Sequence, residues 1–126
     1  MRDRVLIVDD HAGFRASARR VLEHDGYEIV GEAEDGRAAI EAVASLRPEI
    51  VLLDVQLPDL DGFEVARRIA EARDTSADTP EPARPSVVLT STRRGPEIDS
   101  LAATCGASGF VPKEELSGAT LAAQLG

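Results

Sequence analysis

Residues 50–54 read Ile-Val-Leu-Leu-Asp, four large apolar side chains followed directly by a carboxylate. Four apolar residues in a row, without polar residues alternating among them, are typical of a strand that is buried on both faces. Such a strand belongs in the interior of a parallel sheet that helices cover on both sides. We therefore predict an α/β fold in which residues 50–53 form a central strand.

Short apolar runs alternate with helix-length segments on both sides of this strand. Further strands are predicted at residues 5–8, 28–33, 87–89 and 109–111. Helices are predicted at residues 14–23, from Asp35 to about residue 46, and at residues 63–72, 97–104 and 114–124. Residues 73–85 contain three prolines and no periodicity, which predicts a loop. This alternation is typical of a doubly wound parallel sheet with helices on both faces.

Two of the predicted helices carry signals for their ends or for their buried face. Asp35 is placed to cap the second helix, and Pro48 is placed to end it. The first helix is predicted to bury a stripe of apolar residues, namely Phe14, Ala18, Val21 and Leu22.

The composition narrows the class of protein. The chain has 126 residues, which fits one domain, and we take residues 1–126 as a single domain without an output domain. It carries 14 basic and 23 acidic residues, a net charge of −9, which argues against direct binding to nucleic acid or to an anionic membrane. The single cysteine, Cys105, excludes an intrachain disulfide, and no apolar run is long enough to span a membrane. We expect a soluble cytoplasmic domain.

Polar side chains follow the predicted strands directly. Ligands of open parallel sheets bind outside the carboxyl ends of the strands. The residues that the chain places there are Asp9, Asp10, Asp54, Ser91 and Lys113. We expect these three carboxylates, one hydroxyl and one ammonium group to meet at one edge of the sheet.

Three neighbouring carboxylates repel one another unless a cation neutralises them. The candidate ligands are oxygens, which favour a hard ion such as Mg²⁺. Lys113 supplies a point charge suited to a phosphoryl oxygen. Together these groups suit transfer of a phosphoryl group to Asp54, which gives an acyl phosphate. His11 is interpreted as a loop residue or a helix cap without a ligand role, and Arg93-Arg94 as a solvated pair.

The chain resembles the receiver domains of bacterial two-component response regulators over nearly its whole length. The stretches that carry the resemblance are Val8-Asp9-Asp10-His11, Leu53-Asp54-Val55-Gln56-Leu57-Pro58-Asp59-Leu60-Asp61-Gly62, Val87-Val88-Leu89-Thr90-Ser91 and Gly106-Ala107-Ser108-Gly109-Phe110-Val111-Pro112-Lys113. The opening Asp-Asp-His, with Phe14-Arg15 after it, is most similar to receivers that precede a LuxR-type helix-turn-helix domain.

The resemblance implies a flavodoxin-like sheet of five parallel strands in the order 2-1-3-4-5. It makes Asp54 the phosphoacceptor. It makes Asp10, Asp54 and the backbone carbonyl of Gln56 direct Mg²⁺ ligands, and Asp9 a ligand through water.

The resemblance also assigns roles in switching. Lys113 would contact the phosphoryl group, and the hydroxyl of Ser91 would move onto a phosphoryl oxygen. Phe110 stands at the aromatic position that rotates inward with it. The implied partner is a histidine kinase or a phosphotransfer protein, and the implied activity is phosphotransfer with slow self-hydrolysis rather than metabolic catalysis. Residues 116–126 carry no charge, so we expect a second copy or a downstream protein to bind through the last helix.

Three alternatives remain open at this point. The chain could be the receiver of a LuxR-type DNA-binding transcription factor. It could be an interaction module that works without phosphate, although the presence of all five site residues argues against that. It could be a Mg²⁺ phosphatase like the haloacid dehalogenases, but Gln56 stands where those enzymes place a second aspartate.

Overall fold

The computed structural model describes residues 3–75, 85–92, 100 and 107–125. Five parallel strands form one sheet in the order β2-β1-β3-β4-β5. They are β1 (Arg4–Val8), β2 (Glu28–Ala33), β3 (Ile50–Asp54), β4 (Ser86–Ser91) and β5 (Gly109–Pro112). The predicted flavodoxin-like order 2-1-3-4-5 is confirmed, and β3 is the central strand.

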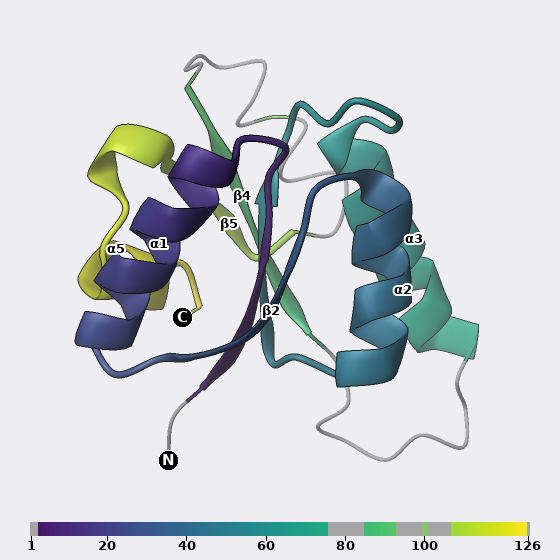
Figure 1. Ribbon diagram of the computed structural model, residues 1–126. Coiled ribbons are helices and arrows are strands. Elements are labelled where there is room, and N and C mark those ends of the chain that lie inside the picture. The colour runs from purple at the N-terminus through teal and green to yellow at the C-terminus, as the bar shows by residue number, and fades with distance from the viewer. Residues whose placement is uncertain (1–2, 76–84, 93–99, 101–106, 126) are drawn as a thin grey trace.

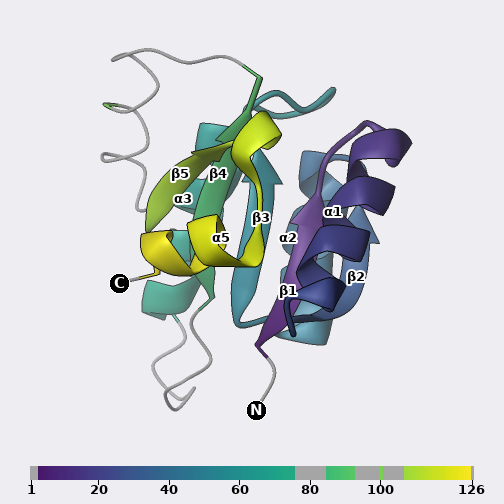
Figure 2. The same cartoon turned by 90° about the vertical axis from the view of Figure 1, so that its left-hand side faces the viewer.

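Helices cover both faces of the sheet (Figure 1). Those in the described residues are α1 (Ala12–His24), α2 (Gly36–Leu46), α3 (Gly62–Thr75) and α5 (Gly118–Gln124), with a single 3₁₀ turn, η1 (Lys113–Glu115), before α5. Helices α1 and α5 lie on the face turned toward the viewer in Figure 2, and α2 and α3 lie behind the sheet. None of the described helices is both long and apolar enough to cross a membrane.

The core has two halves because alternate residues of each strand point to opposite faces of the sheet. Leu6, Val51, Leu53 and Leu89 pack toward α2 and α3. Val5, Ile7, Leu52 and Val88 pack toward α1 and α5. All five residues of β3 are buried, as their unbroken apolar run predicts.

The predicted cap of α2 is confirmed. The carboxylate of Asp35 accepts a hydrogen bond from the N–H of Ala38 at 2.8 Å. The helix ends at Leu46, and Arg47 takes the left-handed conformation with φ 48° before Pro48.

The last helix begins later than predicted. In place of one helix over residues 114–124, the chain makes η1, an extended Leu116, and then α5 from Gly118. The cause is local hydrogen bonding at Ser117, which accepts from the N–H of Thr120 while its own N–H donates to the Thr120 hydroxyl. This capping box fixes the start of α5.

Three further predictions differ in detail or are not covered. Val21 is 37% exposed, because it lies beside the buried stripe of α1 that Ala18 and Leu22 form. Helix α3 continues through residues 73–75, which were predicted as loop. The helix predicted at residues 97–104, apart from Ser100, and Cys105 lie outside the described residues.

Candidate functional site

Two adjacent strands deliver the central carboxylates of the site. Strands β1 and β3 pair in register, with Val8 opposite Leu53, so the residues that follow them lie side by side. Those residues are Asp9 and Asp54, and their exposed fractions are 0% and 3%. The carboxyl ends of these two strands therefore hold two carboxylates in the protein interior, where an unpaired charge costs free energy.

Asp9 is held by its backbone and by one of its carboxylate oxygens. Its N–H donates to the carbonyl of Ala33 at 3.0 Å, and its own carbonyl accepts from the guanidinium of Arg15. Its Oδ1 accepts from the N–H of His11 at 2.8 Å. Its Oδ2 is buried and accepts no well-aligned hydrogen bond from the described residues, although it forms an ion pair with Lys113.

Lys113 carries the positive charge that faces these carboxylates. Its Nζ lies 3.1 Å from Asp54 Oδ2 and also contacts Asp9 Oδ2. Burial lowers the pKa of Lys113, but the two carboxylates outweigh that effect and hold the pKa above its ordinary value. Nζ also lies 4.7 Å from the centre of the Phe14 ring, a cation–π contact. The ammonium group is therefore charged and fixed in place.

The pKa of the Asp54 carboxyl lies above its ordinary value. Burial raises its pKa, and the charge of Asp9 raises it further. A hydrogen bond from the N–H of Gln56 to Asp54 Oδ1, at 3.1 Å, and the ion pair with Lys113 oppose this rise without cancelling it. One lysine thus balances two buried carboxylates, and a second positive charge would relieve the remaining repulsion.

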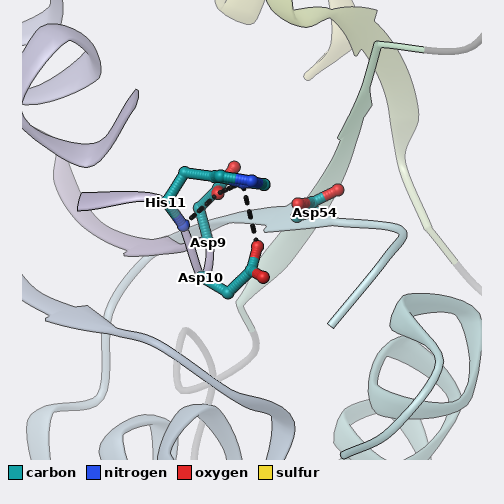
Figure 3. A group of neighbouring side chains, drawn as sticks. All are labelled: Asp9, Asp10, His11 and Asp54. Carbon is teal, nitrogen blue, oxygen red and sulfur yellow. Dashed lines mark hydrogen bonds and ion pairs between the residues drawn. The ribbon is translucent and has the colours of Figure 1, made fainter. Parts of the chain in front are cut away.

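Asp10 and His11 complete a cluster of four possible metal ligands (Figure 3). One ligand atom from each of Asp9, Asp10, His11 and Asp54 lies within 4.8 Å of the others. Asp10 is partly exposed, and its Oδ1 lies 3.0 Å from His11 Nδ1. The sequence interpretation gave His11 no ligand role, whereas the fold turns its ring toward the carboxylates.

This donor set fits a divalent cation. Three carboxylates outnumber the one lysine, and Asp9 Oδ2 is a buried acceptor whose partner among the described residues is the ion pair with Lys113. Carboxylate oxygens are the ligands that Mg²⁺ prefers. The groups that could hold such an ion are the side chains of Asp9, Asp10 and Asp54.

The other predicted site residues lie around this cluster. Ser91 is buried at the end of β4 and pairs with Pro112, the residue before Lys113. Phe110 is half-buried in β5, packs toward α2 and α3, and donates its N–H to Gln124 Oε1 at 3.3 Å. The side chain of Gln56 is exposed. Arg93 and Arg94 lie outside the described residues.

Gly62 lets the loop after Asp54 close tightly. Its N–H donates to the carbonyl of Val55 at 2.9 Å. A Cβ at this position would lie 2.2 Å from the carbonyl oxygen of Asp54 and 2.6 Å from Val55 Cα, both of them backbone atoms. Only glycine fits here, so α3 can begin directly against the end of β3.

Residues 5–124 match the family model for the response regulator receiver domain. The chain is 40% identical over 111 residues to the response regulator MprA of Mycolicibacterium vanbaalenii, covering 87% of this chain and 43% of that protein. It is 38% identical over 114 residues to a protein-glutamate methylesterase/protein-glutamine glutaminase of Alkalilimnicola ehrlichii, covering 90% of this chain and 27% of that protein. The chain thus spans about half or less of the length of the curated relatives it matches.

Among solved structures, the fold is similar to a two-component response regulator of the LuxR family from Aurantimonas. The TM-score is 0.82 at 28% identity, and the match covers 99% of this chain and 86% of that one.

Proposed function

This chain belongs to the family of response regulator receiver domains, and on that premise we propose that it takes up a phosphoryl group on Asp54 beside a bound Mg²⁺ ion. The observation that carries the proposal is the contact of Lys113 with two buried carboxylates, Asp9 and Asp54. We further propose that the donor is a histidine kinase or a phosphotransfer protein and that the product is a switched state of the domain.

The proposed metal site uses the cluster at the ends of β1 and β3. Asp10, Asp54 and the backbone carbonyl of Gln56 would bind Mg²⁺ directly, and Asp9 would bind it through water. When bound, the ion would neutralise negative charge on the carboxylates and on the incoming phosphoryl oxygens.

The proposed transfer needs one nucleophile and one fixed cation from this chain. A carboxylate oxygen of Asp54 attacks the phosphorus of a phosphohistidine. A P–O bond forms, the P–N bond breaks, and its electron pair returns to the departing imidazole. Lys113 Nζ, which faces Asp54 Oδ2 in the structure, moves its contact to a phosphoryl oxygen. The ammonium group thereby stabilises the charge that the transfer brings into the site.

Switching would begin at β4 and β5. Ser91 ends the strand next to the one that leads to Lys113, and its hydroxyl would move onto a phosphoryl oxygen on Asp54. Phe110 is half-buried and would turn inward with that movement. Through the movement of these two side chains, phosphorylation of Asp54 would change the protein surface next to β4 and β5.

A second reading concerns the protein to which this domain belongs. The chain is 40% identical over 123 residues to a putative transcriptional regulator of Pseudomonas aeruginosa, covering 96% of this chain and 55% of that protein, which favours the receiver of a transcription factor. The match to the methylesterase covers only 27% of that protein, so we do not infer an esterase activity for this chain.

Beryllofluoride, which mimics a phosphoryl group on a carboxylate, tests the proposal. Amide NMR spectra should change with beryllofluoride only when Mg²⁺ is present, and the changes should include Ser91 and Phe110. Asp54→Asn should abolish them. Spectra of the wild type that do not change would contradict phosphate-dependent switching and favour the interaction module that works without phosphate.

A further inference from the structure

The side chain of His11 does not cap the helix that follows it. His11 is the residue before α1, the position at which a side chain often caps a helix, but its side chain makes no capping hydrogen bond. Its ring instead lies against the acidic cluster, with Nδ1 at 3.0 Å from Asp10 Oδ1 and 3.2 Å from Asp9 Oδ1 (Figure 3). The turn that brings it there is closed by the hydrogen bond from its own N–H to Asp9.

The imidazole ring of His11 can carry its proton on either nitrogen. The side chain of His11 is 71% exposed, so its outer nitrogen can be solvated. A neutral imidazole holds one proton, and the Nδ1 contacts with the two carboxylates require that proton on Nδ1. If the proton resides on Nε2 instead, the Nδ1 lone pair is directed at the space between the carboxylates.

We propose that His11 donates the Nδ1 lone pair to the cation bound by Asp9, Asp10 and Asp54. The site would then prefer cations that accept an imidazole ligand, and would bind them more tightly than Mg²⁺. The inference rests on the proposed metal-dependent function and adds a nitrogen donor to the oxygen ligands described there. Mg²⁺ favours oxygen ligands, whereas Mn²⁺, Co²⁺ and Ni²⁺ accept imidazole with increasing affinity in that order. One nitrogen among carboxylates therefore shifts selectivity away from Mg²⁺.

The chain provides a matched control. It contains two histidines, and the second, His24, is exposed in the last turn of α1, at the opposite end of that helix. Variants His11→Ala, His11→Gln and His24→Ala change one imidazole each. Because both side chains are exposed, all three variants should fold, and circular dichroism melts verify this.

The first measurement is pulsed electron paramagnetic resonance of the full chain loaded with Mn²⁺. Wild type and His24→Ala should show hyperfine coupling from a directly bound nitrogen, and both His11 variants should lack it. The second is calorimetric titration with Ni²⁺ and with Mg²⁺. The ratio of the Ni²⁺ affinity to the Mg²⁺ affinity should fall on the order of tenfold or more in the His11 variants. Loss of a residue that only hydrogen-bonds to a metal ligand already lowers metal affinity on the order of tenfold, and loss of a ligand should lower it at least as much.

The outcomes separate this inference from the proposed function. Metal binding without nitrogen coupling in wild type, or with an affinity ratio that His11→Ala leaves unchanged, would overturn the role of His11 and leave the carboxylate site intact. Failure of wild type to bind either ion would overturn both the role of His11 and the proposed metal site.

Discussion

Lys113 and the two carboxylates that it contacts define the site at the scale of single residues. Asp9 and Asp54 are buried because they lie at the carboxyl ends of the interior strands β1 and β3, and Lys113 directly follows β5. Two negative charges against one positive charge leave the site short of a cation. The same imbalance that suits a metal ion lowers the stability of the domain without one.

Replacing Asp54 by asparagine should stabilise the metal-free domain. The change removes one buried charge and leaves Lys113 paired with Asp9, so we expect the free energy of unfolding to rise by on the order of 1 kcal/mol. Urea melts with and without Mg²⁺ measure this, with Glu41→Gln, an exposed carboxylate of α2, as the control. Wild type should gain stability from Mg²⁺, because the ion binds the folded site, and Asp54→Asn should gain less. A variant less stable than wild type without metal would contradict the repulsion.

Phe14 holds Lys113 from the side of α1. Phe14→Leu keeps an apolar side chain of similar size but removes the ring face beneath Nζ. We expect a loss of roughly 1 kcal/mol in the free energy of unfolding and slower phosphorylation, while Phe14→Tyr should retain both properties. Stability is measured by urea melts and phosphorylation by the rate of mass increase with acetyl phosphate. Equal rates in Phe14→Leu and Phe14→Tyr would show that the ring does not position the lysine.

At the scale of elements, the central strands could be predicted closely because β1 and β3 contain short, unbroken runs of branched apolar residues, which are typical of buried parallel strands. The start of the last helix could not be predicted, because it depends on the reciprocal hydrogen bonds of Ser117 and Thr120. The ligand position of His11 was missed for a similar reason. The position of this side chain depends on the conformation of the turn after Asp10, which the residue types there do not predict.

The junction between β3 and α3 should not tolerate a side chain. In Gly62→Ala the new Cβ would collide with the backbone of Asp54 and Val55. We expect a loss of about 1–3 kcal/mol in the free energy of unfolding and weaker Mg²⁺ binding, since the strand end must shift. Gly13→Ala in α1 is the matched control, because a Cβ there meets nothing within 4 Å. It should be neutral or stabilising by up to about 1 kcal/mol. Similar losses in the two variants would indicate a general cost of alanine rather than a collision.

Helix α1 is tied to β2 through Glu32, which accepts from Arg15 at 3.0 Å and from Arg19 at 2.9 Å. Burial raises the pKa of Glu32, but these hydrogen bonds outweigh it and lower the pKa below its ordinary value. The folded state therefore favours the ionised form. The resulting stability is present above the pKa of the unfolded chain and is lost as the pH falls through the folded-state pKa.

We therefore expect Glu32→Gln to lower the free energy of unfolding by about 0.5 kcal/mol at neutral pH, the scale of partly exposed ion pairs. The difference from wild type should vanish in acid. Urea melts over a pH series measure it, with Glu28→Gln, an exposed residue of the same strand, as the control. A difference that stays constant into acid would mean that packing, not charge, is responsible.

At the scale of the whole molecule, the sheet order brings distant parts of the sequence to one edge. Asp9, Asp54 and Lys113 lie at the carboxyl ends of three different strands, β1, β3 and β5, and the order β2-β1-β3-β4-β5 brings these ends together. The α/β class could be predicted from alternating runs alone, while the order of strands came from resemblance to a family. Ion pairs and burial at the site had to come from the structure, since they depend on packing between strands that the sequence pattern does not specify.

The association expected through the last helix stays a prediction. Ala119, Ala122 and Ala123 are exposed on α5, whereas Leu125 packs against the core half beneath α1 and α5.

The most direct test of the central claim is the intact mass of the full chain after incubation with acetyl phosphate and Mg²⁺. We predict the addition of one phosphoryl group in wild type, its absence without Mg²⁺, and its absence in Asp54→Asn. Peptide mapping should place the group on Asp54. A phosphoryl group that Asp54→Asn still takes up, or a wild-type mass that does not change, would contradict the assignment of Asp54 as the phosphoacceptor.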